Sequence, residues 1–512
     1  MLNYLKHKLK FVLGENEKSD NYETKTPITH SVDENMIVLR SLYSNTMDLT
    51  TRQIIIGKTK IQFVICEGLV DSQKLAIMLV NPLMRYAENN EVTSQNLKDY
   101  FEKQSVMSID QKIVYDFEEL IRFLGLGFVG VFIEGQNTAF ALAMQGFSYR
   151  SISEPSNEVN ELGSKEAFTE PIKINISLVR RRLKSPNLHC EMMTVGKKSK
   201  TDICLIYMND RVSEKLLSDV KKRINNINLD IVLDSNYIRP FLEKNPYSLI
   251  SSVGNTERPD VLCGKVNEGR IAILVDGSPF ALIVPYLFSE YFRSFDDYVH
   301  KPYFSSLIRI LKYFSFYISF LLPGGYVAVS SFHPELLPSA LLYNIAAAEE
   351  ITPFSLMVEA LFIYLVFEIM REAGIRLPNA VGHTIGIVGA LVIGDAAVEA
   401  GLIGAPMVMV VAITAICAFA ISSLYEPIML LRFVFIILGG TLGLLGIALG
   451  SVIVSAIICS MNSFNVPMTA PLSPTDLRWI NDGIIFTGLK KLSKSKLRIQ
   501  NINGSEIKDK GR

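Results

Sequence analysis

The sequence predicts a soluble N-terminal α/β region of two subdomains, followed by an all-α polytopic membrane domain of about six transmembrane helices. Charged residues make up 20% of the whole chain, but only 14 of the 165 residues from 306 to 470 are charged. Such depletion is what a segment solvated by hydrocarbon requires, because an unpaired charge there is costly. Before residue 306, short apolar runs alternate with segments of helical periodicity, which indicates strands and helices around a water-soluble core.

A chain of 512 residues is too long for one ordinary core, so several domains are expected. Shifts in composition, such as the run rich in Ser, Glu, Asn and Pro around residue 155, suggest the boundaries. The expected parts are a flexible lead at 1–30, a first α/β subdomain at 31–155, a second at 156–270, a connector with a strand and an interfacial helix at 271–305, the transmembrane domain at 306–475 and a basic cytoplasmic tail at 476–512.

Strands and amphipathic helices alternate through both soluble subdomains. Strands are predicted from runs rich in Ile, Val and Phe, and helices from apolar residues spaced at i, i+3 and i+4. The expected strands lie at 53–57, 61–66, 191–195, 203–207, 231–233 and 270–276. The expected helices lie at 72–86, 117–124, 168–183 and 213–224. The apolar run 278–292 is too short to cross a membrane and contains Pro285, so it is predicted to form an interfacial or core helix.

Three apolar runs end in an acidic residue followed by glycine, at Gly68, Gly135 and Gly277. A strand that enters a tight turn has this pattern. We interpret the repetition as strand–turn chemistry and not as a phosphate site.

Four apolar segments of the membrane region are expected to span once each, at 311–332, 353–370, 381–398 and 403–425. Residues 433–475 contain no charge. At ~1.5 Å per residue, one helix of that length would be roughly twice as long as the hydrocarbon is thick. Two helices that close a tight hairpin fit better, and glycines at positions 439, 440, 443, 446 and 450 are available for the break and for close packing.

Basic residues alternate between the connections and predict the orientation. The connections at 335–352 and 395–404 contain no Lys or Arg, whereas the chain after Leu489 carries eight basic residues and two acidic ones. The N-terminal domain and the tail are therefore both expected in the cytoplasm, which requires the last apolar block to cross twice. The basic residues on the expected cytoplasmic side of the spans are Arg293, Lys301, Arg309, Lys312, Arg371, Arg376 and Arg432.

Familiar catalytic patterns are absent from the sequence. It contains no GxSxG, HExxH or GxGxxG, and the GKT run at 57–59 lacks the upstream glycine of a P-loop. The six cysteines and six histidines show no metal-ligand spacing. Lys+Arg and Asp+Glu both number 51, which argues against binding nucleic acid by bulk charge. We expect no enzymatic activity, no catalytic residue, no cofactor, no metal site and no nucleic-acid partner.

Two carboxylates interrupt the second span. Glu359 and Glu368 are nine residues apart, which at ~100° per residue places them on opposite faces of a helix, so they are not expected to share one lumen. A local ion pair with Arg371 is the simpler explanation of Glu368. Glu359 lies deeper and is expected to face protein, water or another polar group.

The third span carries a stripe of residues at spacings of three and four. If copies of this helix surrounded an axis, the stripe would form an apolar constriction next to two carboxylate rings, an arrangement that gates by dewetting and favours cations. An adjacent face of small residues, which includes Gly394 and Ala397, would allow close helix packing. The alternative is that the two carboxylates are simply solvated in an external loop. The candidate pore-lining residues are Ile385, Val388, Val392, Asp395 and Glu399.

Several long, collinear blocks of the sequence resemble the A subunits of the GerA family of spore germinant receptors, over roughly residues 35–480. One segment, ELGSKEAFTE at 161–170, departs from the family pattern. The blocks that carry the resemblance are ISLVRRRLKSPNL at 176–188, TERPD at 256–260, EGRIAILVDGSPFALIVP at 268–285, DDY at 296–298, FHPELLP at 332–338, FEIMREAGIRLP at 367–378, IGIVGALVIGDAAVEAGLI at 385–403 and APLSP at 470–474.

The resemblance implies a multi-pass subunit in the spore inner membrane, surrounded by lipid and with its N-terminal domain in the cytoplasm. It implies as partners a transporter-like B subunit and a lipoprotein C subunit. It also implies a homo-oligomer that forms a ligand-gated cation-release channel at the start of germination. Two alternatives stay open from the residues alone. These are a secondary transporter with a cytoplasmic regulatory domain and a non-conducting receptor scaffold.

Overall fold

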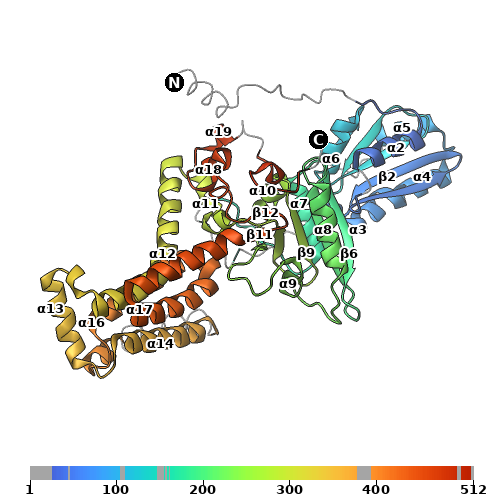
Figure 1. Cartoon of the computed structure of the whole chain (residues 1–512). Coiled ribbons are helices and arrows are strands. Elements are labelled where there is room, and N and C mark those ends of the chain that lie inside the picture. Colours follow the sequence, from blue (N-terminus) through green and yellow to red (C-terminus); the bar gives the residue numbers. More distant parts are fainter. Residues whose placement is uncertain are drawn as a thin grey trace, which may run out of the picture.

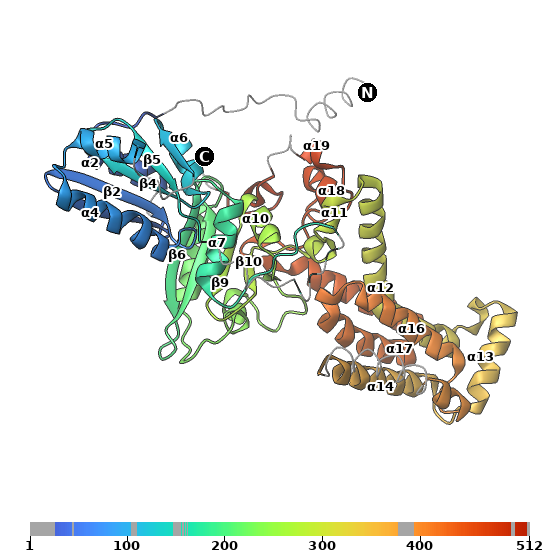
Figure 2. The same ribbon diagram turned by 180° about the vertical axis from the view of Figure 1, so that it is seen from behind.

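The computed structural model describes residues 26–43, 46–103, 110–146, 155, 158, 160, 162–376, 394–492 and 497–508. Within them, two α/β units are followed by a helical bundle that extends away from the second sheet (Figure 1). Seen from behind, the first unit lies on one side of the second unit and the bundle on the other (Figure 2). The predicted order, soluble α/β region first and helical region second, is confirmed.

The first unit is a five-stranded antiparallel sheet with the order β1-β2-β4-β5-β3. Successive side chains of a strand point to opposite faces, so Val64 and Cys66 of β2 pack on one face while Ile61 and Phe63 pack on the other. Both faces are apolar and each needs a covering layer. The strands are β1 (Leu49–Ile56), β2 (Thr59–Cys66), β3 (Gln111–Val114), β4 (Phe128–Ile133) and β5 (Ala139–Ala143).

Helices cover both faces of this first sheet. Helices α2 (Val32–Tyr43) and α6 (Phe117–Leu124) pack on the Val64 face. Helix α6 has the bounds that the sequence predicts. The other face is covered by α5 and by one continuous helical run in which a π-helical turn replaces part of the helix predicted at 72–86. These elements are α3 (Ser72–Leu75), η1 (Ala76–Val80), α4 (Asn81–Asn89) and α5 (Ser94–Lys103).

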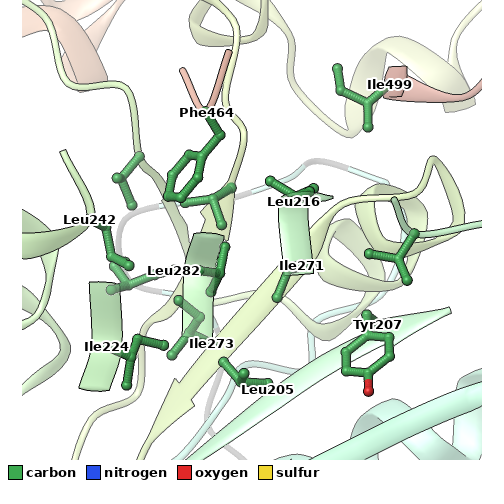
Figure 3. Packing of buried hydrophobic residues seen from close by; sticks show 14 of the residues in the cluster. Leu205, Tyr207, Leu216, Ile224, Leu242, Ile271, Ile273, Leu282, Phe464 and Ile499 are labelled. Atoms are coloured by element: carbon green, nitrogen blue, oxygen red, sulfur yellow. The ribbon is translucent and has the colours of Figure 1, made fainter. Parts of the chain in front are cut away.

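The second unit repeats this plan with the strand order β6-β7-β9-β10-β8, again antiparallel. Helices α7 and α10 cover one face. Helices α8 and α9 cover the other face together with residues from the end of the chain, as in Figure 3, where Phe464 and Ile499 lie over Leu205, Ile273 and Leu282. The elements are α7 (Ile172–Arg182), β6 (Leu188–Val195), β7 (Thr201–Met208), α8 (Glu214–Asn225), η3 (Ser235–Tyr237), α9 (Arg239–Leu242), β8 (Gly254–Thr256), α10 (Pro259–Asn267), β9 (Ile271–Val275) and β10 (Ala281–Val284).

The three acidic–glycine motifs lie where the sequence predicts turns. They follow β2, β4 and β9, and Gly68, Gly135 and Gly277 have φ values of 84°, 85° and 86°. A positive φ is strained for residues with a Cβ atom, so glycine closes each strand.

The described part of the basic tail is a layer of the second unit. Ile499, Ile502 and Ile507 are buried in the same core as α8 and β9. The Ile499 amide donates to the Glu268 carbonyl at 2.8 Å, and the Ser213 hydroxyl donates to the Ile507 carbonyl. The membrane region therefore starts and ends at the same soluble unit. The elements after the bundle are β11 (Asn462–Ser463), β12 (Val466–Pro467), α18 (Leu477–Gly483), α19 (Leu489–Leu492) and η7 (Ile499–Asn501).

Several sequence predictions for the soluble region are wrong. The run 278–292 forms strand β10 and the short 3₁₀-helix η4 (Phe288–Phe292), because a short, fully apolar run has no periodicity that separates a buried strand from a buried helix. Strands β9 and β10 belong to the second sheet, so a connector does not begin at 271. Residues 231–233 form no strand. The lead predicted at 1–30 lies mostly outside the described residues, but Ile28 is buried in the first unit.

Two helices of the described bundle are long and apolar enough to cross a membrane, namely α12 and the run Ser422–Ser460. A third candidate is the pair α13 and α14, whose axes differ by 77°. The third predicted span, 381–398, lies mostly outside the described residues. The helices at and beyond the junction are α11 (Asp296–Val299), α12 (Pro302–Phe332), η5 (Pro334–Leu336), α13 (Ser339–Ile351), α14 (Leu356–Arg376), α16 (Ala405–Phe419), η6 (Ser422–Leu424) and α17 (Tyr425–Ser460).

Helix α17 is a hairpin of two helical arms. Gly443 has φ 61° and ψ −147°, which breaks the helix. In a straight helix, residues 435 and 450 would be ~22 Å apart. Instead, a Cβ atom on Gly450 would lie 3.2 Å from the Phe435 ring, and one on Gly446 would lie 2.4 Å from the Leu438 carbonyl oxygen. The hairpin predicted for this segment is confirmed, with its break at one of the predicted glycines.

Replacing Gly443 by alanine is expected to destabilise the chain by about 1–3 kcal/mol, because the new Cβ meets a backbone conformation that L-residues avoid. It would also lie 3.2 Å from the Phe332 side chain. Thermal unfolding of the detergent-solubilised chain measures the effect. Gly325→Ala in α12 is the control, since nothing lies within 4 Å of its added Cβ. Equal melting temperatures for the two variants would contradict the hairpin.

Candidate functional site

The predicted pore stripe is only partly within the described residues. Ile385, Val388 and Val392 lie outside them. Asp395 and Glu399 lie on a short helix at 394–399, and both side chains are exposed. The stripe as a whole stays a prediction.

The face of this short helix next to the stripe packs against α16. Ala397 is buried with Met407 and Val411 of α16, and a Cβ atom on Gly394 would lie 3.8 Å from Val408. Small residues allow this close approach. The two carboxylates therefore point away from the chain's own bundle, in the direction open to water or to another copy.

Glu368 is the centre of a polar cluster that joins three helices. Its carboxylate pairs with Arg371 at 3.0 Å, accepts from the Tyr425 hydroxyl at 2.7 Å and lies 3.4 Å from Arg432. The Arg432 guanidinium is fully buried and also donates to the Ser319 carbonyl of α12 at 3.0 Å. The predicted local pair with Arg371 is confirmed. Arg432 was not predicted to be a partner of Glu368, because a basic residue at the end of an apolar segment was interpreted only as an indication of orientation.

Glu359 lies in a different environment. It is 1% exposed, and its Oε1 accepts from the Gly404 amide at 2.7 Å, at the start of α16. Glu359 thus faces protein, as expected for a carboxylate deep in an apolar segment. Since Glu368 contacts Arg432 and Glu359 contacts Gly404, the two carboxylates belong to separate clusters.

A second buried cluster lies where the soluble region meets the bundle. Arg309 of α12 is fully buried and donates to the Asp297 carboxylate at 2.7 Å and to the Asp482 carbonyl. Arg293 donates to the Asp482 carboxylate at 3.0 Å, and the Tyr298 hydroxyl donates to it at 3.1 Å. Residues from before the bundle, from its first helix and from after its last helix therefore meet at one place.

The same junction contains another buried group of charges, centred on Glu290 in η4. The carboxylate of Glu290 is paired with Arg270, at the start of β9, and with Lys265 of α10. Burial alone would raise the pKa of Glu290, but the positive charges of Arg270 and Lys265 outweigh it and lower that pKa from 4.5 to about 2. Glu290 is therefore ionised in the folded protein at neutral pH. It fastens η4 to the second sheet.

Residues 38–497 match the family model described as the Bacillus/Clostridium GerA spore germination protein. The chain belongs to the GerA family.

Relatives of this GerA protein match along most of their length. It is 39% identical to "Spore germination protein KA" of Bacillus subtilis (strain 168), over 89% of this chain and 84% of the relative. It is 34% identical to "Spore germination protein A1" of the same organism, over 84% and 92%. It is also similar to the crystal structure of the N-terminal domain of the A subunit of the Bacillus megaterium spore germinant receptor GerK3, with 30% identity, a TM-score of 0.42 and coverage of 52% and 99%.

The blocks that resemble the GerA family supply most of the buried ion pairs. TERPD contains the pair of Arg258 with Asp260, EGR contains Arg270, and DDY contains Asp297. No role was predicted for these charges; the partners of Arg270 and Arg309 are 20 and 12 residues away, and such separations leave no periodic signal. In the segment that departs from the family pattern, Glu166 pairs with Arg181 and Arg182 of α7.

Glu368→Gln is expected to destabilise the solubilised protein by about 3–5 kcal/mol, because it leaves the buried Arg432 without its anionic partner. Glu372→Gln on the same helix is the matched control. Glu372 is exposed and pairs with Arg376, so its loss is expected to cost less than ~1 kcal/mol. Denaturant unfolding measures both. Similar losses for the two variants would argue against the cluster.

The contribution of Glu290 to stability is expected to depend on pH. Its folded pKa is lowered, so the stabilisation is present above 4.5, the unfolded value, and disappears as pH falls towards about 2. The difference in unfolding free energy between the wild type and Glu290→Gln should be largest at neutral pH, at about 3–5 kcal/mol. It should shrink steadily between pH 4.5 and 2. A difference that does not change with pH would refute this assignment.

Proposed function

We propose that this chain is the A subunit of a nutrient germinant receptor, and that several copies form a cation-release channel in the spore inner membrane. Its membership of the GerA family supports a role in germination, as do relatives named as spore germination proteins. In this proposal the chain acts with a transporter-like B subunit and a lipoprotein C subunit. It binds a signal through this assembly and carries out no enzymatic reaction.

The proposed topology has six spans, with both soluble parts in the cytoplasm. Helix α12 starts at the junction, where Arg309 pairs with Asp297. Helix α14 returns towards the junction, since Glu359 near its start contacts Gly404, whereas Glu368 near its end contacts Tyr425. The η6 turn that precedes Tyr425 lies beside the soluble unit, where the Ser423 hydroxyl approaches the Tyr291 carbonyl at 3.5 Å.

The remaining segments complete this alternation. Helix α16 runs from Gly404 to the η6 turn and is the fourth crossing. The third crossing in this proposal is the span predicted from the sequence at 381–398, which lies mostly outside the described residues. The two arms of α17 are the fifth and sixth crossings, because the break at Gly443 returns the chain to the second unit. An even number of crossings agrees with the packing of the tail on the second α/β unit, which precedes the bundle in the sequence.

The observation that carries the channel proposal is the arrangement of residues 394–399. Asp395 and Glu399 are exposed while Ala397 between them is buried against α16. A carboxylate pair that faces away from its own apolar bundle is costly in lipid. A ring of identical copies would turn the pairs towards a shared aqueous path, where acidic rings favour cations. Below them, Val392, Val388 and Ile385 would form the apolar constriction.

Passive ion flux through liposomes that contain the purified chain tests this proposal. Val392→Ser is expected to raise the cation flux severalfold, because a polar side chain wets an apolar constriction. Asp395→Asn with Glu399→Gln is expected to reduce the preference for cations over anions. Glu372→Gln, an exposed carboxylate outside the stripe, is the control.

Other outcomes would favour other functions. Substrate-coupled uptake would indicate a transporter. An intact assembly that stays silent in every variant would indicate a scaffold, and an unchanged flux in Val392→Ser would count against the stripe.

A further inference from the structure

Helices α12, α13 and α14 and the turn before α16 approach one another at the end of the bundle that is farther from the second sheet (Figure 1). Within the described residues, Oε1 of Glu349 and Oε2 of Glu359 are buried without a hydrogen-bond partner, and the buried Oγ of Ser330 interacts with the side chain of Tyr326. They come from α13, α14 and α12 respectively. Neither the proposed pore nor the Glu368 cluster uses these atoms.

The helical segments that carry the two carboxylates meet at the Gly404 turn. A Cβ atom on Gly404 would lie 3.5 Å from Glu359 Oε1 and 3.6 Å from the Cβ of Ala348, the neighbour of Glu349 on α13. The side chains of Glu349 and Glu359 interact electrostatically with each other and with Tyr326 of α12. The Gly404 amide holds Oε1 of Glu359, which leaves Oε2 free to bind a ligand.

The charges of this pair are not compensated by the described part of the chain. Neither Glu349 nor Glu359 takes part in an ion pair there, although Glu359 is 1% exposed. Burying a carboxylate without a counter-charge is strongly unfavourable. The Glu368 cluster in the bundle and the Arg309 cluster at the junction solve this problem with arginine. This one contains no arginine or lysine among the described residues, so its carboxylates have to be neutralised either by protons or by a cation from solution.

We propose that Glu349 and Glu359 bind one Ca²⁺-like divalent cation. All the available ligand atoms are oxygens, which hard cations prefer over nitrogen and sulfur ligands. Two carboxylates match a charge of +2, whereas a monovalent ion would leave one negative charge in an apolar setting. Ca²⁺ accepts irregular shells of carboxylates, hydroxyls and water, while Mg²⁺ requires a nearly ideal octahedron. The described residues bring no third carboxylate, His or Cys to the pair, so Ser330, Tyr326 and water would complete the shell.

A cation at this position would connect parts that otherwise have few contacts. Helices α13 and α14 meet at an angle of 77°, and most of α13 is exposed. Binding would fix the end of α13 to α14 and to the Gly404 turn. This inference concerns the solubilised single chain and does not depend on conduction.

The test is equilibrium binding of ⁴⁵Ca²⁺ to the full-length protein in detergent at neutral pH. The wild type is expected to bind one ion per chain with saturation below about 1 mM, the weakest range of protein calcium sites. Glu359→Gln and Glu349→Gln should each weaken binding at least tenfold. Glu350→Gln is the matched control, because Glu350 is the exposed neighbour of Glu349 on the same helix. It should bind like the wild type.

Four results would overturn the proposal. These are no saturable binding by the wild type, unchanged binding in both Gln variants, an equal loss in Glu350→Gln, and displacement of Ca²⁺ by an equal concentration of K⁺. The first would indicate that protons neutralise the carboxylates, and the fourth would exclude a divalent site. If Glu359→Gln fails to fold, Glu349→Gln and a Ca²⁺-dependent rise in the melting temperature of the wild type still decide the question, since a ligand that binds only the folded state stabilises it.

Discussion

The pairing of buried charges at the junction is the interaction on which the rest of this structure depends. Arg309 is at the start of the first long apolar helix and is completely buried. A buried guanidinium is tolerated only when it is paired and hydrogen-bonded. Asp297 and Asp482 meet that need from opposite ends of the membrane region. One ion-pair cluster thereby fixes where the bundle begins, where it ends and how both relate to the second sheet.

This constraint also explains why the tail is folded. Once Asp482 is held by Arg293 and Tyr298, the residues that follow lie over the second sheet. Ile499 and Ile502 then complete an apolar core that would otherwise be open to water. The second unit is consequently built from chain segments that precede the bundle and from segments that follow it. A displacement of that unit would therefore act on both ends of the bundle together. Such a mechanical connection suits a receptor subunit.

The helical bundle contains two buried carboxylates, and their surroundings stabilise them in two different ways. Near the junction, Glu368 is neutralised by Arg371 and Arg432. Towards the opposite end, the Glu359 carboxylate accepts one hydrogen bond from a backbone amide and forms no ion pair among the described residues. At the end near the junction, the chain's own arginines neutralise the buried carboxylate, whereas at the other end Oε2 of Glu359 has no hydrogen-bond partner among the described residues. The exposed Asp395 and Glu399 add further negative charge, and neither forms an ion pair with a basic side chain among the residues that the structure describes.

The sequence by itself determined the features that depend on composition and short-range periodicity. These are the division between soluble and apolar halves, the strand–glycine turns at Gly68, Gly135 and Gly277, and the break of the last apolar segment into a hairpin. It did not reveal the strand β10, because its run of apolar residues suits a strand and a buried helix equally well. The sequence predicted the local pair of Glu368 with Arg371, but only the tertiary structure decided the partners of buried charges that lie far apart along the chain. Arg309 and Asp482 are 173 residues apart, and no local pattern encodes a contact that forms only when two distant segments are desolvated together.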